Sequence, residues 1–571
     1  MTIARQYQKR IPGIRRAAAA AALFLTTLCV LALIATQPAQ AQTYSFKTIY
    51  SFTGANASDG AAPYGGLVVD ALGNLYGTTT LGGSNASACH PVKGPAGCGT
   101  VFEISPSGGG SWTESVLYRF TSDSTINGNT GTTCYDGAIP YGGVALGANG
   151  NLFGTTSVGG VNGLGTVFEV LQPSSTNPLP PVQDQPCFSS NGLWTEVPLH
   201  SFDGNASGNG DGANPEGGLV LDRLGNLYGT DYNTIFKVDP IGRLTTLYNF
   251  SLNPYDSQGN ANGTNPGSVL VLSGSNLFGT TLSGGNNGMG TAFELAKYSN
   301  VADAVETGIL QFGYGDQFGI QDGAEPFSGL AGTASALYGT TFEGGNGFGT
   351  VYKTTSLGVE TVLYSFNGQA DGGGPVGGIV RDKKGNIYGT TSSGGAYGFG
   401  TVFKVSPVSV INDVYNETTL YSFTGGADGG GPTAGLVFDA QGDLYGTTYS
   451  GGVNTGGCGA IYGCGTVFEL QLLPATTTTL VSSAEPAIVG ETVNFTATIT
   501  PAPPDGELVS FTVATYSTRT TVVSGSQALA GGSATFSTSA IPVGSYLVTA
   551  TYPGDSNLAP STGKVVQLVK R

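Results

Sequence analysis

One acidic residue recurs along most of the chain inside a short motif. The motif Asp-Gly-x-x-Pro occurs six times, and a seventh copy reads NGTNP from residue 262. A ring of carboxylates could bind calcium or a hydroxyl-rich ligand, whereas each Asp could instead cap its own turn while the Pro fixes entry into the next strand. Since a feature of every repeat usually maintains the repeat, we favour the structural role. The candidate acids are Asp59, Asp136, Asp211, Asp322, Asp371 and Asp428.

Catalytic signals are sparse. The chain has two histidines, His90 and His200, and the simplest interpretation of His200, in a predicted outer strand, is a surface residue. A Ser-His-Asp site or a histidine-rich metal centre is hard to assemble from so few imidazoles. Paired carboxylates for glycoside cleavage stay open, because the sequence does not give their separation. We therefore assign no catalytic residue and lean away from an enzyme.

The cysteines indicate an oxidising compartment. Six of the seven lie beyond the N-terminal apolar segment, and four of these fall in corresponding loops of the first and last repeats. In an exported protein we expect local disulfides there, with a metal site as the alternative in the first loop. The expected pairs are Cys89–Cys98 and Cys458–Cys464. The metal alternative would use Cys89, His90 and Cys98. Pairing stays open for Cys134 and Cys187.

Repeated strands must position these residues. Three patterns recur in seven copies: one built on aromatic-Gly-Thr, as in NLYGTT, one of the type GTVFE, and an outer one ending in Phe, such as ETVLYSF. With GGLVxD they give four strand-like runs per copy, rich in Val, Tyr, Phe and Thr and separated by Gly, Asn and Asp. Four strands in about 50 residues are typical of a β-propeller blade.

The ends of the repeat array fit a closed ring. Residues 44–52 match only the outer run, and the last copy lacks that run. The N-terminal strand should therefore complete the seventh blade and remove the free edges. Loops after the outer run and after YGTT share one face and vary most in length. We call this the loop face and expect ligand binding there.

The residues after the repeats change pattern. VNFTATIT, LVSFTVAT, SATFST and YLVTATY alternate apolar and polar residues, which predicts a small antiparallel sandwich. The predicted fold class is therefore all-β, with a seven-bladed β-propeller over 42–474 and an Ig-like β-sandwich over 475–571.

The N-terminus has the composition of a secretory signal peptide over residues 1–41. Basic residues precede an apolar run, and Ala-Gln-Ala offers a cleavage site. The chain has 37 acidic and 21 basic residues, and removal of the signal peptide would take away only basic ones. So acidic a protein should be repelled by nucleic acid and anionic membranes. No second apolar run is long enough for a membrane span.

The phrases GGLVxDxxGNLYGTTxxGG, GTVFKV and ETVLYSF resemble the GloVer tandem repeat of bacterial exported (choice-of-anchor) proteins, and more distantly the NHL-type propeller repeat. The resemblance covers about residues 45–470. The tail, with TTTTLVSSAEPAIVGETVNFTATITP and IPVGSYLVTATYPGDSNLAPST, resembles the bacterial Ig-like repeat. Such modules usually act as spacers or presenters, and the fold alone assigns no ligand.

Together these features predict an exported, non-catalytic recognition or scaffold protein, located extracellularly, at the cell surface or in the periplasm. It would bind glycan or protein through propeller loops, as a monomer, with calcium as a candidate cofactor. Two alternatives stay open. One is an extracellular polysaccharide hydrolase or lyase that uses loop carboxylates, and the other is a structural component of the envelope or matrix.

Overall fold

A computed structural model gives the fold of the chain. It describes residues 43–54, 59–83, 97–121, 136–173, 187–188, 194–204, 211–250, 262–296, 306–313, 322–409, 414–453, 458 and 463–571. The expected signal peptide lies outside these ranges. The described chain divides into two compact units, Ser45–Leu472 and Leu473–Arg571, the second together with Thr43 and Tyr44. No described segment forms a helix long and apolar enough to cross a membrane.

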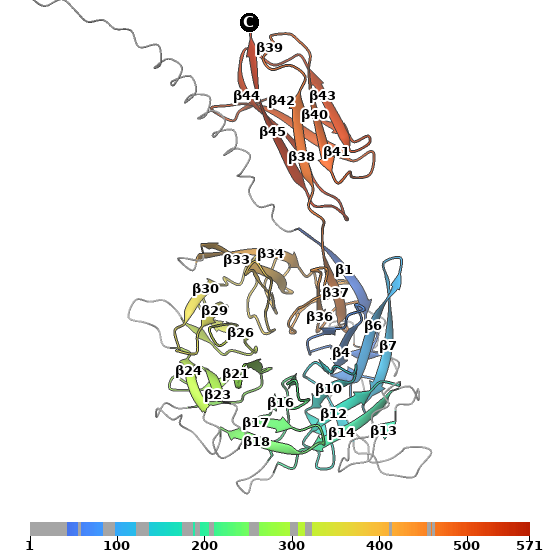
Figure 1. Cartoon of the computed structure of the whole chain (residues 1–571), viewed down its shortest axis with the longest axis vertical. Coiled ribbons are helices and arrows are strands. Elements are labelled where there is room, and N and C mark those ends of the chain that lie inside the picture. Colours follow the sequence, from blue (N-terminus) through green and yellow to red (C-terminus); the bar gives the residue numbers. More distant parts are fainter. Residues whose placement is uncertain are drawn as a thin grey trace, which may run out of the picture. The chain divides into compact units, whose positions relative to one another are not determined.

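The first unit consists of antiparallel sheets that follow one another around a central opening (Figure 1). Among the described residues, six of these sheets have four strands and one has five. From the opening outward, the first sheet contains β3 (Val68–Val69), β4 (Leu75–Thr79), β6 (Thr100–Gly108) and β7 (Ser111–Arg119).

The following sheets repeat this order. The second contains β9 (Ala145–Leu146), β10 (Leu152–Thr156), β12 (Thr166–Leu171), β14 (Thr195–Ser201) and β13 (Cys187–Phe188), and the third contains β15 (Val220–Leu221), β16 (Leu227–Thr230), β17 (Thr234–Val238) and β18 (Leu244–Asn249). The fourth contains β20 (Val271–Ser273), β21 (Asn276–Thr281), β23 (Thr291–Ala296) and β24 (Glu306–Gln311). The fifth contains β26 (Ala331–Thr333), β27 (Ala336–Thr341), β29 (Thr350–Thr354) and β30 (Thr361–Ser365). The sixth contains β31 (Val380–Arg381), β32 (Ile387–Thr391), β33 (Thr401–Ser409) and β34 (Val414–Ser422).

The last sheet joins the two ends of the unit. It runs β35 (Val437–Phe438), β36 (Leu444–Thr448), β37 (Thr466–Leu472) and then β1 (Tyr44–Ser51). The strand that begins the described chain therefore pairs with the strand that ends the repeats. This pairing covers the edge of β37 that would otherwise be free.

Within the described ranges, four small two-stranded sheets connect the Asp-Gly-x-x-Pro turn, or NGTNP in the fourth copy, with the segment that follows YGTT. They are β2 (Gly60–Ala61) with β5 (Leu81–Gly82), β8 (Gly137–Ala138) with β11 (Val158–Gly159), β19 (Gly263–Thr264) with β22 (Ser283–Gly284), and β25 (Gly323–Ala324) with β28 (Glu343–Gly344).

Aromatic pairs form the core between neighbouring sheets. The Phe that ends each outer run meets the aromatic residue of the next Gly-Thr-Val-Phe run, as in Phe52 with Phe102, whose ring centroids lie 5.1 Å apart at 65°. Edge-to-face packing of this kind adds to the burial of the rings. The other pairs are Phe120–Phe168, Phe202–Phe236, Phe250–Phe293, Phe312–Tyr352, Phe366–Phe403 and Phe423–Phe468.

The glycine of the Gly-Thr-Val-Phe run lies where neighbouring sheets come closest. Gly400 has φ +93°, and a Cβ there would lie 2.2 Å from the carbonyl oxygen of Thr391 and 2.8 Å from Cδ of Pro432. Pro432 belongs to the Asp-Gly-x-x-Pro turn that leads into the following sheet. Only glycine combines this conformation with this close approach.

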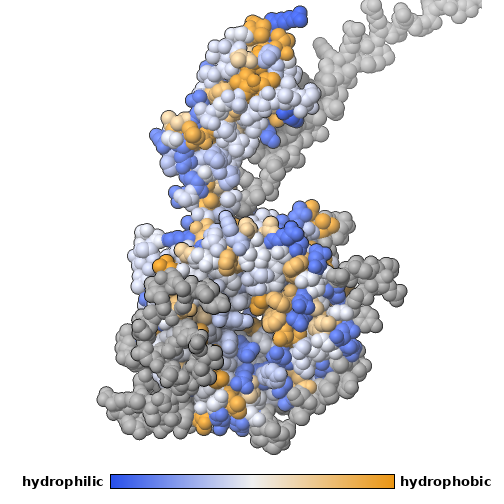
Figure 2. Space-filling view, turned by 180° about the vertical axis from the view of Figure 1, so that it is seen from behind, coloured by the Kyte–Doolittle hydropathy of each residue, from blue (hydrophilic) through white to orange (hydrophobic). Residues whose placement is uncertain are grey.

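The second unit has the two sheets of a β-sandwich, whose surface mixes hydrophobic and hydrophilic residues (Figure 2). Phe495, Phe511, Val548 and Tyr552 are buried in its core. One sheet contains β38 (Thr477–Ser482), β40 (Val493–Thr500) and β43 (Ser533–Thr538). The other contains β39 (Ala487–Ile488), β45 (Ser561–Lys570), β44 (Gly544–Tyr552), β41 (Leu508–Thr515) and β42 (Thr521–Ala528).

Candidate functional site

A cavity of about 1430 Å³ lies at the centre of the first unit, and every sheet around the opening contributes residues to its wall. We call it the central cavity. Most of its wall is built from the segments that follow the Pro of each Asp-Gly-x-x-Pro motif, or of NGTNP in the fourth copy, and continue into the innermost strands. Apolar residues such as Leu67, Val144 and Leu219 line much of it.

One position in this wall differs from sheet to sheet. It is the residue that directly follows the Pro of the motif. Two small residues, usually Gly-Gly, come after it in most copies, so its position in the wall is constant while its side chain varies. We call these residues the mouth residues. They are Tyr64, Tyr141, Glu216, Gly267, Phe327, Val376 and Thr433.

Three tyrosines gather on one side of the cavity. Tyr64 lies between the other two, with ring centroids 5.4 Å from Tyr141 at 84° and 6.1 Å from Tyr449 at 86°. Tyr449 directly follows YGTT, so the group belongs to the loop face. Tyr64 and Tyr141 are partly buried, whereas Tyr449 is 41% exposed. All three tyrosines line the cavity.

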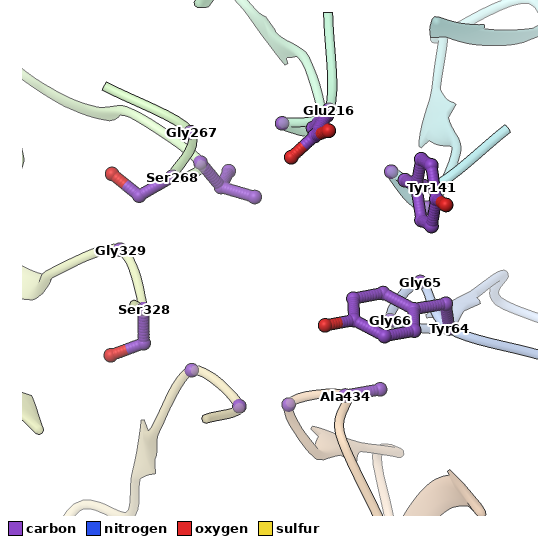
Figure 3. Close-up of a pocket in the computed structure, with 18 of the residues that line it drawn as sticks. Tyr64, Gly65, Gly66, Tyr141, Glu216, Gly267, Ser268, Ser328, Gly329 and Ala434 are labelled. Carbon is purple, nitrogen blue, oxygen red and sulfur yellow. The ribbon is translucent and has the colours of Figure 1, made fainter. Parts of the chain in front are cut away.

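Glu216 lies next to Tyr141 along the rim of the opening. Figure 3 shows Tyr64 and Tyr141 on one side of the central opening, across from Ser268 and Ser328, with Glu216 between Tyr141 and Gly267. Glu216 is exposed to the open cavity, yet the protein around it raises its pKa through desolvation. Burial raises the pKa of Tyr64 and of Tyr141 as well, and the charge of Glu216 adds to both shifts.

Glu216 is also distinctive in its charge. Among the described residues that line the central cavity, it is the one carboxylate, and there is no Lys, Arg or His beside it. The cavity therefore has a single negative charge next to an aromatic cluster.

The wall that holds these side chains is rigid because neighbouring backbones touch. A Cβ at Gly65 would lie 2.4 Å from the backbone nitrogen of Gly143, so the two inner segments pack without side chains between them. The Thr78 hydroxyl donates to the carbonyl oxygen of Gly142 at 2.8 Å, across to the next sheet. Thr155 makes the corresponding bond to Gly217 at 2.9 Å. Such contacts fix the mouth residues before any ligand arrives.

The recurring acids lie elsewhere, in the turns after the outer strands, and none is among the described residues of the cavity wall. Asp136 accepts hydrogen bonds from the Tyr118 hydroxyl at 3.0 Å and from the Thr121 backbone N–H at 2.8 Å. Both donors come from the end of the preceding outer strand. Asp59, Asp371 and Asp428 accept the same pair of bonds from their own outer strands.

Two acids use other partners. Asp211 pairs with Nε2 of His200 at 2.6 Å and accepts the Asp203 N–H at 2.9 Å. His200 thus takes the place of the repeat's Tyr and is largely buried, not the surface residue that the sequence indicated. Asp322 accepts the N–H of Gly323 at 3.1 Å and lies beside the buried Glu360.

The recurring acids are thus not brought together. The described residues contain no group of three or more His, Cys, Asp or Glu side chains that could hold a metal. The contacts of each acid agree with a role in its own turn. The calcium site stays a prediction.

Some recurring acids do influence another acidic side chain. In each case a Glu at or beside an outer strand faces the Asp in the turn that follows the outer strand of the preceding sheet. Burial, followed by a hydrogen bond with Asp322, raises the pKa of Glu360. Burial together with the charge of Asp59 raises the pKa of Glu114 to about 7. Burial also raises the pKa of Glu417 to about 7, with a smaller contribution from Asp371. These carboxyls therefore take up protons more readily than free ones.

The expected disulfide between Cys458 and Cys464 is present, with Cα atoms 5.3 Å apart. Its sulfurs cover Gly54, where a Cβ would lie 2.2 Å from Sγ of Cys458. Cys98 is buried and disulfide-bonded, so it is not available as a thiolate metal ligand. The predictions for Cys89, His90 and Cys134 fall outside the described residues. Cys187 begins β13, and its pairing stays open.

The tyrosine cluster and Glu216 were not predicted from the sequence. The predicted site residues were acids that recur in most repeats, whereas the tyrosines and Glu216 occupy positions whose residue type differs between repeats. The available signal was the variable position inside the constant Pro-x-Gly-Gly phrase, read as PYGG, PYGG and PEGG in the first three copies.

Comparisons with known proteins concern both units. Residues 305–481 match the Gloeobacter/Verrucomicrobia repeat, and residues 479–569 match the bacterial Ig-like domain of group 3. No curated protein matches the chain. Among solved structures, a gluconolactonase from Xanthomonas campestris aligns at 12% identity and a TM-score of 0.29, over 59% of this chain and 86% of that chain. The matched part of the first unit is therefore similar to the Gloeobacter/Verrucomicrobia repeat, and the second unit to bacterial Ig-like domains.

Proposed function

We propose that the protein is an exported recognition or scaffold protein that acts at or outside the bacterial cell surface. It binds glycan or protein on the loop face of a seven-bladed β-propeller, which β1 closes, and the Ig-like sandwich serves as a spacer. Residues 1–41 would be its signal peptide, residues 42–474 the propeller and residues 475–571 the sandwich.

The observation that most directly supports this proposal is the contrast between repeated and variable positions. The repeated acids accept hydrogen bonds from their own strands, as Asp136 does from Tyr118. The variable mouth residues Tyr64, Tyr141 and Glu216 face a cavity of about 1430 Å³. Aromatic side chains on a fixed frame are typical of ligand sites.

Two features support a secreted, non-catalytic protein. A disulfide such as Cys458–Cys464 persists in oxidising compartments. Glycosidases generally use two carboxyl groups across the scissile bond, whereas the described residues of the cavity wall include one, Glu216. This favours recognition over hydrolysis at the central cavity.

Binding of the full chain to a panel of cell-wall and environmental polysaccharides tests the proposal, with calcium or with chelator, while soluble products are measured. We expect saturable binding without product, and at least tenfold weaker binding for Tyr64→Leu. Tyr232→Leu is the matched control, because Tyr232 is 61% exposed and is not part of the cavity wall.

Other results have distinct meanings. Released oligosaccharide would move the assignment to a hydrolase or lyase. Loss of binding with chelator and on Asp371→Ala would assign the site to the recurring acids. If no glycan or surface protein is bound, a structural role in the envelope or matrix replaces the proposal. Fractionation of the producing cells tests export, with the mature chain expected outside the cytoplasm and beginning near residue 42.

A further inference from the structure

We propose that the central cavity recognises a cationic group of its ligand, an amine or quaternary ammonium, through Tyr64, Tyr141, Tyr449 and Glu216. The inference rests on the proposed recognition function and names the chemistry of the bound group. An amino sugar of a polysaccharide carries such a group, and so does a choline substituent.

The aromatic geometry fits a cation. The rings of Tyr141 and Tyr449 stand nearly perpendicular to that of Tyr64, at 84° and 86°. Ring planes at right angles form a corner, in which the electron-rich faces attract a cation and the ring edges do not. Cations are attracted to aromatic faces within about 6 Å, and aromatic clusters are the usual means of binding quaternary ammonium groups.

The charge of the cavity fits as well. Glu216 stands beside this corner, and its carboxylate influences both Tyr64 and Tyr141. Among the described residues of the cavity wall no cationic side chain neutralises it. The chain as a whole carries an excess of acids, 37 against 21 basic residues. An anionic ligand would be repelled both at long range and in the site, whereas a cation would be drawn in.

The opposite side of the cavity offers little to a charged group. The Ser268 hydroxyl accepts a hydrogen bond from Thr280 at 3.0 Å, and the Ser328 hydroxyl is paired with that of Thr340 at 2.8 Å. Phe327 is 38% exposed there. A ligand with a cationic group on one side and an apolar sugar face on the other would therefore have one favoured orientation.

Isothermal titration of the full chain with four probes tests the inference: glucosamine tetramer, its fully N-acetylated counterpart, choline and glucose tetramer. We expect glucosamine tetramer or choline to bind, and the two neutral oligosaccharides to bind at least tenfold more weakly. The pair of cationic probes separates an amino sugar from a quaternary ammonium ligand. Binding should weaken as salt rises from 50 to 500 mM, because charge attraction is screened.

Conservative variants locate the site. Glu216→Gln should weaken the cationic probe at least tenfold, and Tyr64→Leu similarly, while Tyr64→Phe keeps the ring and most of the affinity. Glu343→Gln, an exposed carboxylate of β28 outside the cavity wall, is the control for charge. Thermal unfolding of each variant separates loss of binding from loss of fold.

The results decide between four outcomes. Equal affinity for acetylated and free amino sugar overturns the inference but leaves glycan recognition standing. If Glu216→Gln and Tyr64→Leu leave cation binding unchanged, Glu216 and Tyr64 do not form the cation site. If no cationic probe binds while a neutral polysaccharide does, the inference fails and the proposed function survives. If nothing binds in either this test or the panel, both fail.

Discussion

Tyrosine and carboxylate side chains have different roles in two regions of the first unit. In the turn after β7, Tyr118 and Asp136 are both buried, and the Tyr118 hydroxyl donates to the Asp136 carboxylate at 3.0 Å. At the mouth of the central cavity, Tyr64 and Glu216 face the opening (Figure 3). The first pairing recurs from sheet to sheet, and the second does not. Tyrosine and carboxylate therefore indicate a site only where the fold leaves them facing a cavity.

Energetics explain the contrast. A buried carboxylate is stable only when donors surround it, so the turns of Asp59, Asp136, Asp371 and Asp428 supply each Asp with a hydroxyl and an N–H group of its own outer strand. The side chains of the mouth residues are not needed to stabilise the cavity wall, because backbone contacts such as that of Gly65 with Gly143 already do so. Their side chains are free to differ from sheet to sheet.

The largest effect should come from filling the space at Gly400, which is closed by a strand of its own sheet and by Pro432 of the turn that leads into the next sheet. Gly400→Ala places a Cβ 2.2 Å from the Thr391 oxygen at φ +93°, and we expect it to lower the free energy of unfolding by about 3 kcal/mol. Gly398→Ala is matched in backbone, with φ +85° and no atom within 4 Å, and should cost about 1 kcal/mol. Denaturant unfolding followed by tryptophan fluorescence measures both, because Trp112 and Trp194 lie in the first unit. Equal losses would contradict the importance of the close approach.

The next effect tests the comparison directly. Asp136→Asn weakens the bonds from Tyr118 and Thr121 and should lower stability by about 2 kcal/mol, with ligand binding retained. Glu216→Gln should change stability by less than about 0.5 kcal/mol and should affect binding alone. The same unfolding experiment and one titration compare the two variants. A reversal of these effects would show that the recurring acids form the site.

A disulfide replaces an apolar contact in the last sheet. Cys464 occupies the position that Phe399 has in the sheet before it, and each covers a glycine, Gly54 or Gly425. Cys458→Ser with Cys464→Ser should cost about 2 kcal/mol, given a loop of six residues. Cys458→Ser with Cys464→Phe should recover part of the loss if the positions are equivalent. Stability that stays unchanged in the double serine variant would argue against this role.

The smallest effect concerns pH. The pKa of Glu360 is raised by burial and by Asp322, so the folded protein binds this proton more tightly than the unfolded chain. Its stabilising contribution is complete below the usual glutamate pKa and is lost as the pH rises through the raised value. Glu360→Gln should therefore raise Tm by roughly 2 °C at pH 8 and leave it nearly unchanged at pH 4.

Many of the strands can be predicted from the sequence. VNFTATIT and LVSFTVAT coincide with β40 and β41, because alternating burial directly specifies a two-faced sheet. The innermost runs were less well predicted. GGLVVD contributes only Val68 and Val69 to β3, since the glycines before them are engaged with the neighbouring segment instead of a strand partner. The strands β38, β39, β42 and β45 of the sandwich were not predicted.

The sequence by itself determined the number of repeats, the strand order within them and the pairing of Cys458 with Cys464, because all of these depend on local spacing. Only the tertiary structure decided which residues meet at the centre. Tyr64, Tyr141 and Tyr449 come from different sheets, and Tyr449 reaches Tyr64 because β1 pairs with β37. Contacts between residues so far apart in the chain depend on how the sheets are arranged around the opening, which local propensity does not encode.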